Sequence, residues 1–215
     1  MLQSAVDTDV LFKGASYGFL RELVGVVTPD LGQVGVLGAA PFVIRSKLRR
    51  ANLTSPPEKV VQMIEQFVRE AAVLEPTREE IRFAAQLEFV AQRANLSLDE
   101  GESLLCAIVI GRALSWLVTG DKRAVSSFEQ LLESNQEAAQ LAGKVLCLEQ
   151  LFLRLINDEN GVSIRNAVCR EVNVDRALAI CFSCCSPEVG PESWRSGLRS
   201  YVADLRSRAP TLLGA

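Results

Sequence analysis

Acidic residues follow or flank apolar runs at three places in the sequence. Asp7 and Asp9 come directly after "LQSAV", Asp121 ends the run "SWLVTG", and Glu102 opens the apolar segment that precedes that run. In parallel α/β sheets, ligand sites collect at the carboxyl ends of the strands. If these runs are strands of such a sheet, the four carboxylates converge on one rim.

Converging carboxylates would form a site that offers only oxygen ligands, which suits Mg²⁺ or Mn²⁺. Such an ion lowers the pKa of a bound water and neutralises charge that develops on a phosphodiester. The alternative is that Asp7 and Asp121 are turn residues, because Asp is common where strands end. Several unpaired carboxylates at one rim repel each other, and this cost favours a metal site.

The chain contains no histidine, which removes Ser-His-Asp and Cys-His catalysis and imidazole metal ligands. Its cysteines lie mostly in apolar runs, as buried thiols in a reducing compartment would. They are Cys106, Cys147, Cys169, Cys181, Cys184 and Cys185. The cluster "CFSCC" lacks a second ligand pair at zinc-finger spacing, so we do not expect zinc.

The composition is that of a soluble globular protein, with 215 residues, 48% of them hydrophobic and 23% charged. A net charge of −3 gives no general attraction to nucleic acid, so any such contact needs a local basic patch. The sequence shows neither a signal-peptide pattern nor an apolar run of about 18 residues. We therefore expect no membrane contact and a cytoplasmic protein.

Apolar runs alternate with helical periodicity up to about residue 157. We predict strands at 2–12, 32–44, 113–121 and 144–150. Helices are predicted at 14–27, from 55, from 77, from 97, at 122–143 and at 149–157. Capping-box spacing predicts that Thr77 and Ser97 cap two of these helices, and it places Glu102 about one turn into the second.

This alternation predicts an α/β fold with a mostly parallel sheet over residues 1–157. Within it, residues 52–96 are expected to form a helical insertion, and 158–215 a helical C-terminal extension. The last helix carries an apolar stripe of Trp194, Leu198, Tyr201, Val202 and Leu205. Such stripes seal the core or face another chain, so a protein partner and a homo-oligomer both stay open.

Three short motifs, in this order, resemble the PIN-domain ribonucleases: "VDTDVL", "DEGES" and "WLVTGDKRAV". The resemblance covers roughly residues 1–157, and the 19-residue step from Glu102 to Asp121 is similar to that family's spacing. It implies a parallel-sheet PIN-like domain that cleaves single-stranded RNA with Mg²⁺ or Mn²⁺. Asp7 would be the first metal-binding acid, with Glu102 and Asp121 the later two.

The same resemblance makes Asp9 a secondary metal ligand, with Asp99 and Glu100 as fallback ligands. The chain departs from the family at the segment after the second strand, "VIRSKLRRANL", which has no acid. A carboxylate could instead come from the inserted helices, where Glu58, Glu65 and Glu70 are candidates. Otherwise the site is incomplete, and the protein is a PIN-like module that binds without cutting.

That segment is basic instead, and its cations are candidates for RNA binding: Arg45, Lys47, Arg49 and Arg50. Four cations beside an acidic metal site could hold phosphates and make binding salt-dependent. The alternative is a solvated helix face, the commoner role of a charge run.

A further enzyme class also fits part of the pattern. Asp7-Thr8-Asp9 resembles the nucleophile loop of haloacid-dehalogenase-type phosphatases, in which the first Asp is phosphorylated and the second is a general acid. Those enzymes usually carry another Asp shortly after a segment like "TGDKRAV", and none follows here. Among ribonuclease roles, the sequence leaves toxin, processing and defence functions open.

Overall fold

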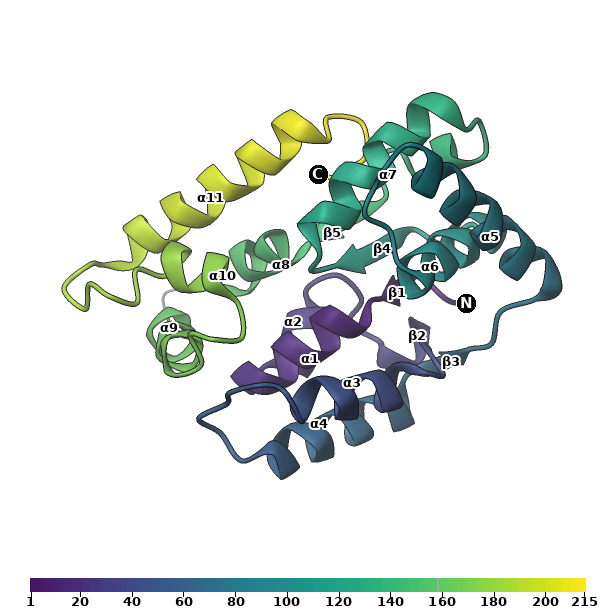
Figure 1. The fold of residues 1–215 in the computed structure, drawn as a ribbon. Helices are drawn as coiled ribbons and strands as arrows, with labels where there is room; N and C mark the ends of the chain where they lie inside the picture. Colours follow the sequence, from purple (N-terminus) through teal and green to yellow (C-terminus); the bar gives the residue numbers. More distant parts are fainter. Residues whose placement is uncertain (158) are drawn as a thin grey trace.

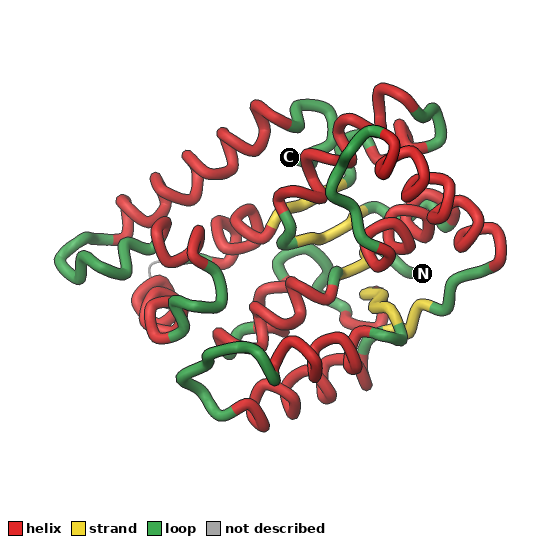
Figure 2. The backbone as a smooth tube through the Cα atoms, viewed as in Figure 1, coloured by secondary structure: helices red, strands yellow, loops and turns green. Residues whose placement is uncertain are grey.

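The computed structural model describes residues 1–157 and 159–215, and these form a five-stranded parallel sheet covered by helices on both faces (Figures 1 and 2). The strands lie in the order β3-β2-β1-β4-β5. Their bounds are β1 Ser4–Val6, β2 Val34–Leu37, β3 Ala72–Leu74, β4 Trp116–Thr119 and β5 Val145–Cys147. The predicted α/β class with a parallel sheet is confirmed.

Side chains of the strands alternate between two hydrophobic cores, as the pleat requires. Val6, Val36 and Val118 point into one core, while the neighbouring Leu37 and Leu117 point into the other. Because both faces are buried, the strands read as continuous apolar runs in the sequence.

The helices form two layers (Figure 1). One core is covered by α1 Thr8–Tyr17, α2 Leu20–Gly25, α3 Ala40–Leu48, α4 Pro57–Glu70 and α8 Leu148–Leu155. The other is covered by α5 Arg78–Arg93, α6 Glu100–Gly111 and α7 Lys122–Ser134. Short 3-10 turns precede β2 and β5, at η1 Leu31–Gln33 and η2 Ala138–Leu141.

The C-terminal segment is helical, as expected, with α9 Gly161–Arg170, α10 Arg176–Cys181 and α11 Pro191–Arg208. Trp194, Leu198 and Leu205 of the α11 stripe are buried against this chain's own cores. Beyond α11 the tail returns to the sheet, where Leu213 forms a parallel bridge with Val145 of β5. The stripe therefore seals the core of its own chain.

The structure corrects several boundaries of the predicted elements: the helix predicted at 14–27 divides into the end of α1 and α2, and that predicted at 122–143 ends at Ser134. Three further corrections bear on the sheet. The first strand ends at Val6, and Asp9 lies in the first turn of α1 instead of at a strand end. The second strand ends at Leu37, and α3 begins at Ala40 with Pro41 in its first turn, where a helix tolerates proline. Residues 72–74, expected within a helical insertion, form the edge strand β3, which is too short to show a periodicity of its own.

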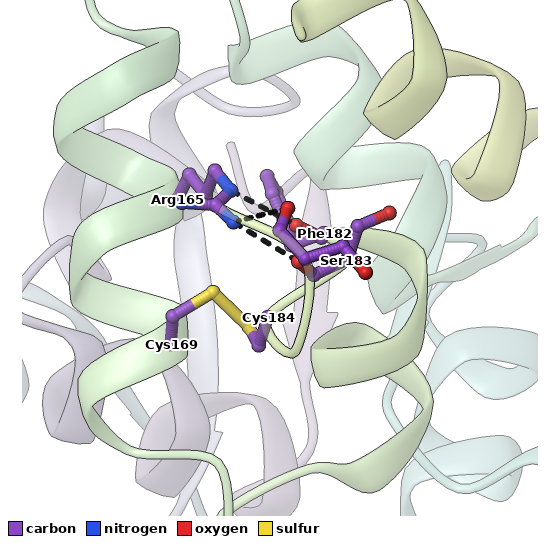
Figure 3. The surroundings of a disulfide bond; sticks show 6 residues. Arg165, Cys169, Phe182, Ser183 and Cys184 are labelled. Atoms are coloured by element: carbon purple, nitrogen blue, oxygen red, sulfur yellow. Dashed lines mark hydrogen bonds between the residues drawn. A yellow bond between two sulfur atoms is a disulfide. The ribbon is translucent and has the colours of Figure 1, made fainter. Parts of the chain in front are cut away.

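The cysteines are not all free thiols. Cys106, Cys147 and Cys181 are buried and unbonded, as the apolar context indicated, and Cys185 is exposed. Cys169 at the end of α9 is bonded to Cys184 after α10 (Figure 3), a pairing that the sequence analysis did not foresee. None of the helices in the two described ranges has both the length and the apolar character that a membrane crossing needs.

Candidate functional site

The strand order places a topological switch between β1 and β4. From β1 the chain builds β2 and β3 on one side, and β4 continues to β5 on the other. The crevice at the carboxyl ends of two such strands is the usual ligand site of open parallel sheets. Asp7 directly follows β1, and Asp121 lies two residues beyond β4, so both acids lie at this crevice.

A cavity of about 490 Å³ occupies the crevice. It is lined by every acid of the three motifs that the sequence analysis named as a candidate metal ligand. These acids are Asp7, Asp9, Asp99, Glu100, Glu102 and Asp121. Two cations, Lys47 and Arg123, also line the cavity, together with apolar side chains from β2, α3 and α6. Six carboxylates thus face two cations, and this excess of negative charge sets the electrostatics of the site.

Asp7 is buried, with 8% of its surface exposed. It occupies the N-cap position of α1, yet its side chain makes no capping hydrogen bond. Its Oδ2 accepts a hydrogen bond from the Thr119 hydroxyl at 3.3 Å. Burial, and then the charge of Asp9, raise the pKa of Asp7 to about 6. A turn residue at a helix start would cap the helix, so the structural reading does not account for this side chain.

Glu102 lies in the first turn of α6 and is also 8% exposed. Its Oε2 accepts from the Asp99 backbone N–H at 2.9 Å, while Asp99 Oδ1 accepts from the Glu102 N–H at 2.9 Å. This reciprocal capping box shows that Asp99, and not Ser97, caps the helix. Burial raises the pKa of Glu102 to about 8, and the charges of Asp99, Asp121 and Asp7 add to that rise.

Asp121 differs from Asp7 and Glu102 because an arginine pairs with its carboxylate. Its Oδ1 accepts from the Arg123 N–H at 2.8 Å and caps α7, and its Oδ2 lies 2.7 Å from the Arg123 guanidinium. Burial acts to raise the pKa of Asp121, but the hydrogen bonds from Arg123 outweigh it and hold this pKa below its ordinary value. Asp121 therefore stays ionised at neutral pH.

Asp9 is held by two cations. Its carboxylate lies 2.6 Å from Lys13 Nζ and 3.3 Å from Lys47 Nζ. Lys47 belongs to α3, the helix on which the PIN-like pattern would place a further acid. The structure therefore puts an ammonium group at this side of the cavity, and it pairs with the secondary ligand candidate.

Glu58, Glu65 and Glu70, the candidate acids from the inserted helices, lie away from the cavity. Glu65 pairs with Arg45 at 2.8 Å, and Glu70 pairs with Arg21. Glu58 lines a separate hollow between α3 and α4. None of these three glutamates lines the acidic cavity.

The basic segment covers the second half of α3 and the turn after it. Ile44 and Leu48 are buried, so the cations between and after them project outward. Arg49 and Arg50 are exposed, and neither forms an ion pair within the described residues. Arg50 lies with Asp9 and Lys47 around a second hollow that adjoins the acidic cavity.

The donor set fits a hard divalent cation in its chemistry, because every acid that lines the cavity offers only oxygen. Within residues 1–157 and 159–215, however, no three Asp, Glu or Cys side chains are gathered closely enough to hold one ion. Two of the candidate ligands are already engaged by other groups: the capping box engages Oε2 of Glu102, and Arg123 engages Asp121. An ion would have to draw Asp121 away from Arg123.

Several residues of the site escaped the sequence analysis, namely Lys13, Thr119, Gly120 and Arg123. Of these, Gly120 could have been found from the sequence, because a glycine at a strand end often marks a place where another part of the chain approaches closely. Thr119 links two acids, because its Oγ1 also accepts from the Asp121 N–H at 3.1 Å.

The sequence matches no protein-family model, and no curated protein matches it.

Proposed function

We propose that this protein is a PIN-like endoribonuclease that cleaves single-stranded RNA with Mg²⁺ or Mn²⁺. The observation that carries the proposal is the burial of Asp7 and Glu102 in one cavity with the ionised Asp121. Both buried acids have raised pKa values, because burial disfavours their charged forms and the neighbouring carboxylates add to that effect.

Asp7, Glu102 and Asp121 would hold the metal, with Asp99 and Glu100 at the rim as further oxygen donors. A bound divalent cation would supply a water of lowered pKa and neutralise charge on the scissile phosphate. Thr119 orients Asp7 through its hydroxyl. Asp9, held in ion pairs by Lys13 and Lys47, has a positioning role in this scheme.

The exposed side of α3 would hold the RNA. Lys47 lines the cavity, and Arg49 and Arg50 continue the positive charge along the surface from it. Phe42 on the same helix is 72% exposed, and an aromatic ring beside a row of cations is what single-stranded bases use for stacking. A strand laid along α3 would bring its phosphates to the mouth of the acidic cavity.

The second candidate is a PIN-like protein that binds RNA or a protein partner without cutting. Two observations favour it: no three acids of the described chain are gathered for one ion, and α3 offers Lys47 where an acid would be needed. The phosphatase alternative needs Asp9 as a general acid, and here two ammonium groups engage that carboxylate.

Cleavage of an end-labelled, unstructured RNA in Mn²⁺, with and without a chelator, separates these candidates. Asp121→Asn is the informative variant, because asparagine also caps helices well and removes only the charge. We expect wild type to cut, the chelator to abolish cutting, and Asp121→Asn to be at least about 100-fold slower. The control is Asp204→Asn, which removes the charge of an exposed acid paired with Arg208 on α11.

RNA binding without cleavage at any Mn²⁺ concentration would support the non-cutting candidate. Cutting that persists in excess chelator, or that Asp121→Asn leaves unchanged, would contradict the metal-dependent mechanism.

A further inference from the structure

A buried lysine joins the acidic cavity to the C-terminal segment. Lys13 of α1 has only 10% of its side chain exposed, and its Nζ lies 2.6 Å from Asp9 and 2.7 Å from Asp175. Burial lowers the pKa of Lys13, but the charges of Asp9 and Asp175 outweigh burial and raise this pKa above its ordinary value. The lysine is therefore a fixed positive charge between two carboxylates.

Asp175 comes from the segment between α9 and α10. Its side chain is 5% exposed, and its Oδ1 accepts from the Leu178 N–H at 3.0 Å, which caps α10. Its Oδ2 contacts Lys13 and also lies 3.7 Å from Lys122 Nζ. One carboxylate thus caps a helix with one oxygen and faces two lysines with the other.

Both lysines hold the turn that carries Asp121. Lys13 Nζ donates to the Gly120 carbonyl at 3.4 Å, and Lys122 is the residue directly after Asp121. Lys122 is itself tied to the fully buried Glu149 of α8 at 2.7 Å. The residues on both sides of Asp121 are thereby fixed by the interior of the protein.

The segment that carries Asp175 is held firmly at both ends. The Cys169–Cys184 disulfide closes it, and Arg165 of α9 donates to the carbonyls of Phe182 and Ser183 (Figure 3). At its start, the buried Glu171 accepts from the backbone N–H groups of residues 54 and 55. Because this segment is anchored, Asp175 can hold Lys13 and Lys122 in fixed positions.

We infer that Asp175 is a positioning residue of the acidic cavity: it fixes Lys13 and Lys122, and through them Asp9 and the turn that carries Asp121. The C-terminal segment is then a component of the site as well as a cover for the core. The positions of Asp9 and of the turn depend only on the ion pairs and hydrogen bonds described above. Only the catalytic consequence rests on the proposed ribonuclease function.

Hydrogen exchange of the metal-free protein tests the placement without reference to any activity. Asp175→Asn retains the cap of α10 and removes the charge that faces the lysines. The stability control is Leu198→Ala, which opens a cavity under α11 and destabilises the protein without touching an ion pair. Asp204→Asn controls for removal of an exposed acid.

We expect Asp175→Asn to speed amide exchange at residues 118–123 and 7–13 by about tenfold, beyond any change in Leu198→Ala. We expect no such change in Asp204→Asn. Faster exchange confined to residues 170–208, or equal to that of Leu198→Ala at the turn, would overturn the inference and leave Asp175 as a helix cap.

If wild type cleaves RNA, Asp175→Asn should lower kcat about tenfold and leave KM nearly unchanged, since Arg49 and Arg50 of the basic segment have no ion pair or hydrogen bond with Lys13, Lys122 or Asp9. A rise in KM at unchanged kcat would contradict the positioning role. If wild type does not cleave RNA, the proposed function fails, and the exchange measurement still decides whether Asp175 positions the turn.

Discussion

The hydroxyl of Thr119 donates to Asp7 Oδ2 at 3.3 Å across the two central strands. Thr119 Oγ1 also accepts a hydrogen bond from the backbone N–H of Asp121. The last residue of β4 therefore connects the two acids that follow β1 and β4. This connection holds the Asp7 carboxylate inside the cavity, where it is desolvated, and does not allow it to turn toward solvent.

Asp7→Asn should stabilise the metal-free protein, and the gain should depend on pH. The pKa of Asp7 rises from 3.8 to about 6 on folding. The wild-type carboxyl group is protonated in both states below about pH 3, and the wild-type protein loses stability as pH rises from about 3 to 6. Asparagine does not titrate and can still accept from Thr119. We expect a gain near zero at about pH 3 and of about 3 kcal/mol above about pH 6.5, since one pKa unit is worth roughly 1.4 kcal/mol.

Melting curves in chelator at several pH values measure this gain as a Tm increase of about 6–12 °C at neutral pH. A variant that melts below wild type at pH 7 would show that Asp7 is a structural turn residue.

Gly120→Ala should disturb the site although the substitution is small. A Cβ atom at residue 120 would lie 2.6 Å from Asp9 Oδ2 and 3.3 Å from Lys13 Nζ. Asp9 cannot swing aside easily because Lys13 and Lys47 both hold it. We expect a decrease of about 1–3 kcal/mol in the free energy of unfolding, as for other overpacked interiors.

Gly25→Ala is the matched control, since nothing lies within 4 Å of a Cβ built there and its backbone is helical. Chemical denaturation of the two variants gives the comparison. Equal stability of Gly120→Ala and Gly25→Ala would mean that Asp9 is free to move, and its ion pairs would then not position it.

Arg49 and Arg50 offer the cleanest test of RNA binding, because neither forms an ion pair in the described part of the chain. Changing both to Ser should weaken binding of single-stranded RNA and reduce the slope of log K against log salt by about 1.4, or roughly 0.7 for each phosphate that is no longer neutralised. Arg78→Ser with Arg82→Ser on α5, across the sheet, should leave that slope unchanged. Titrations at several salt concentrations measure it, and equal slopes for both pairs would make the α3 cations a solvated surface.

The sequence predicted the sheet and its acidic rim because both depend on local signals. Runs such as "SWLVTG" are apolar throughout, as strands buried on both faces are, and the acids that follow two of them, Asp7 and Asp121, mark the rim. β3 escaped prediction because three residues carry no periodicity, and α1 because Val10 and Leu11 fit a strand or a helix equally well.

The contacts of the acids could not be read from the sequence. Asp99 and Ser97 both have capping potential, and only the fold decides that Asp99 forms the box with Glu102. The pairing of Lys13 with Asp175 joins residues far apart in the chain, and no spacing rule indicates it. For the same reason the Cys169–Cys184 bond was missed, since six cysteines allow many pairings.

The most direct test of the central claim is a crystal structure of the protein soaked in Mn²⁺, with the ion located by its anomalous scattering. We expect one Mn²⁺ in the cavity, within about 2.0–2.3 Å of carboxylate oxygens from Asp7, Glu102 and Asp121, with Arg123 displaced from Asp121. Lys13 should keep its contacts with Asp9 and Asp175. A cavity that holds no Mn²⁺ at millimolar concentration, with Arg123 still paired to Asp121, would contradict the shared metal site and with it the nuclease mechanism.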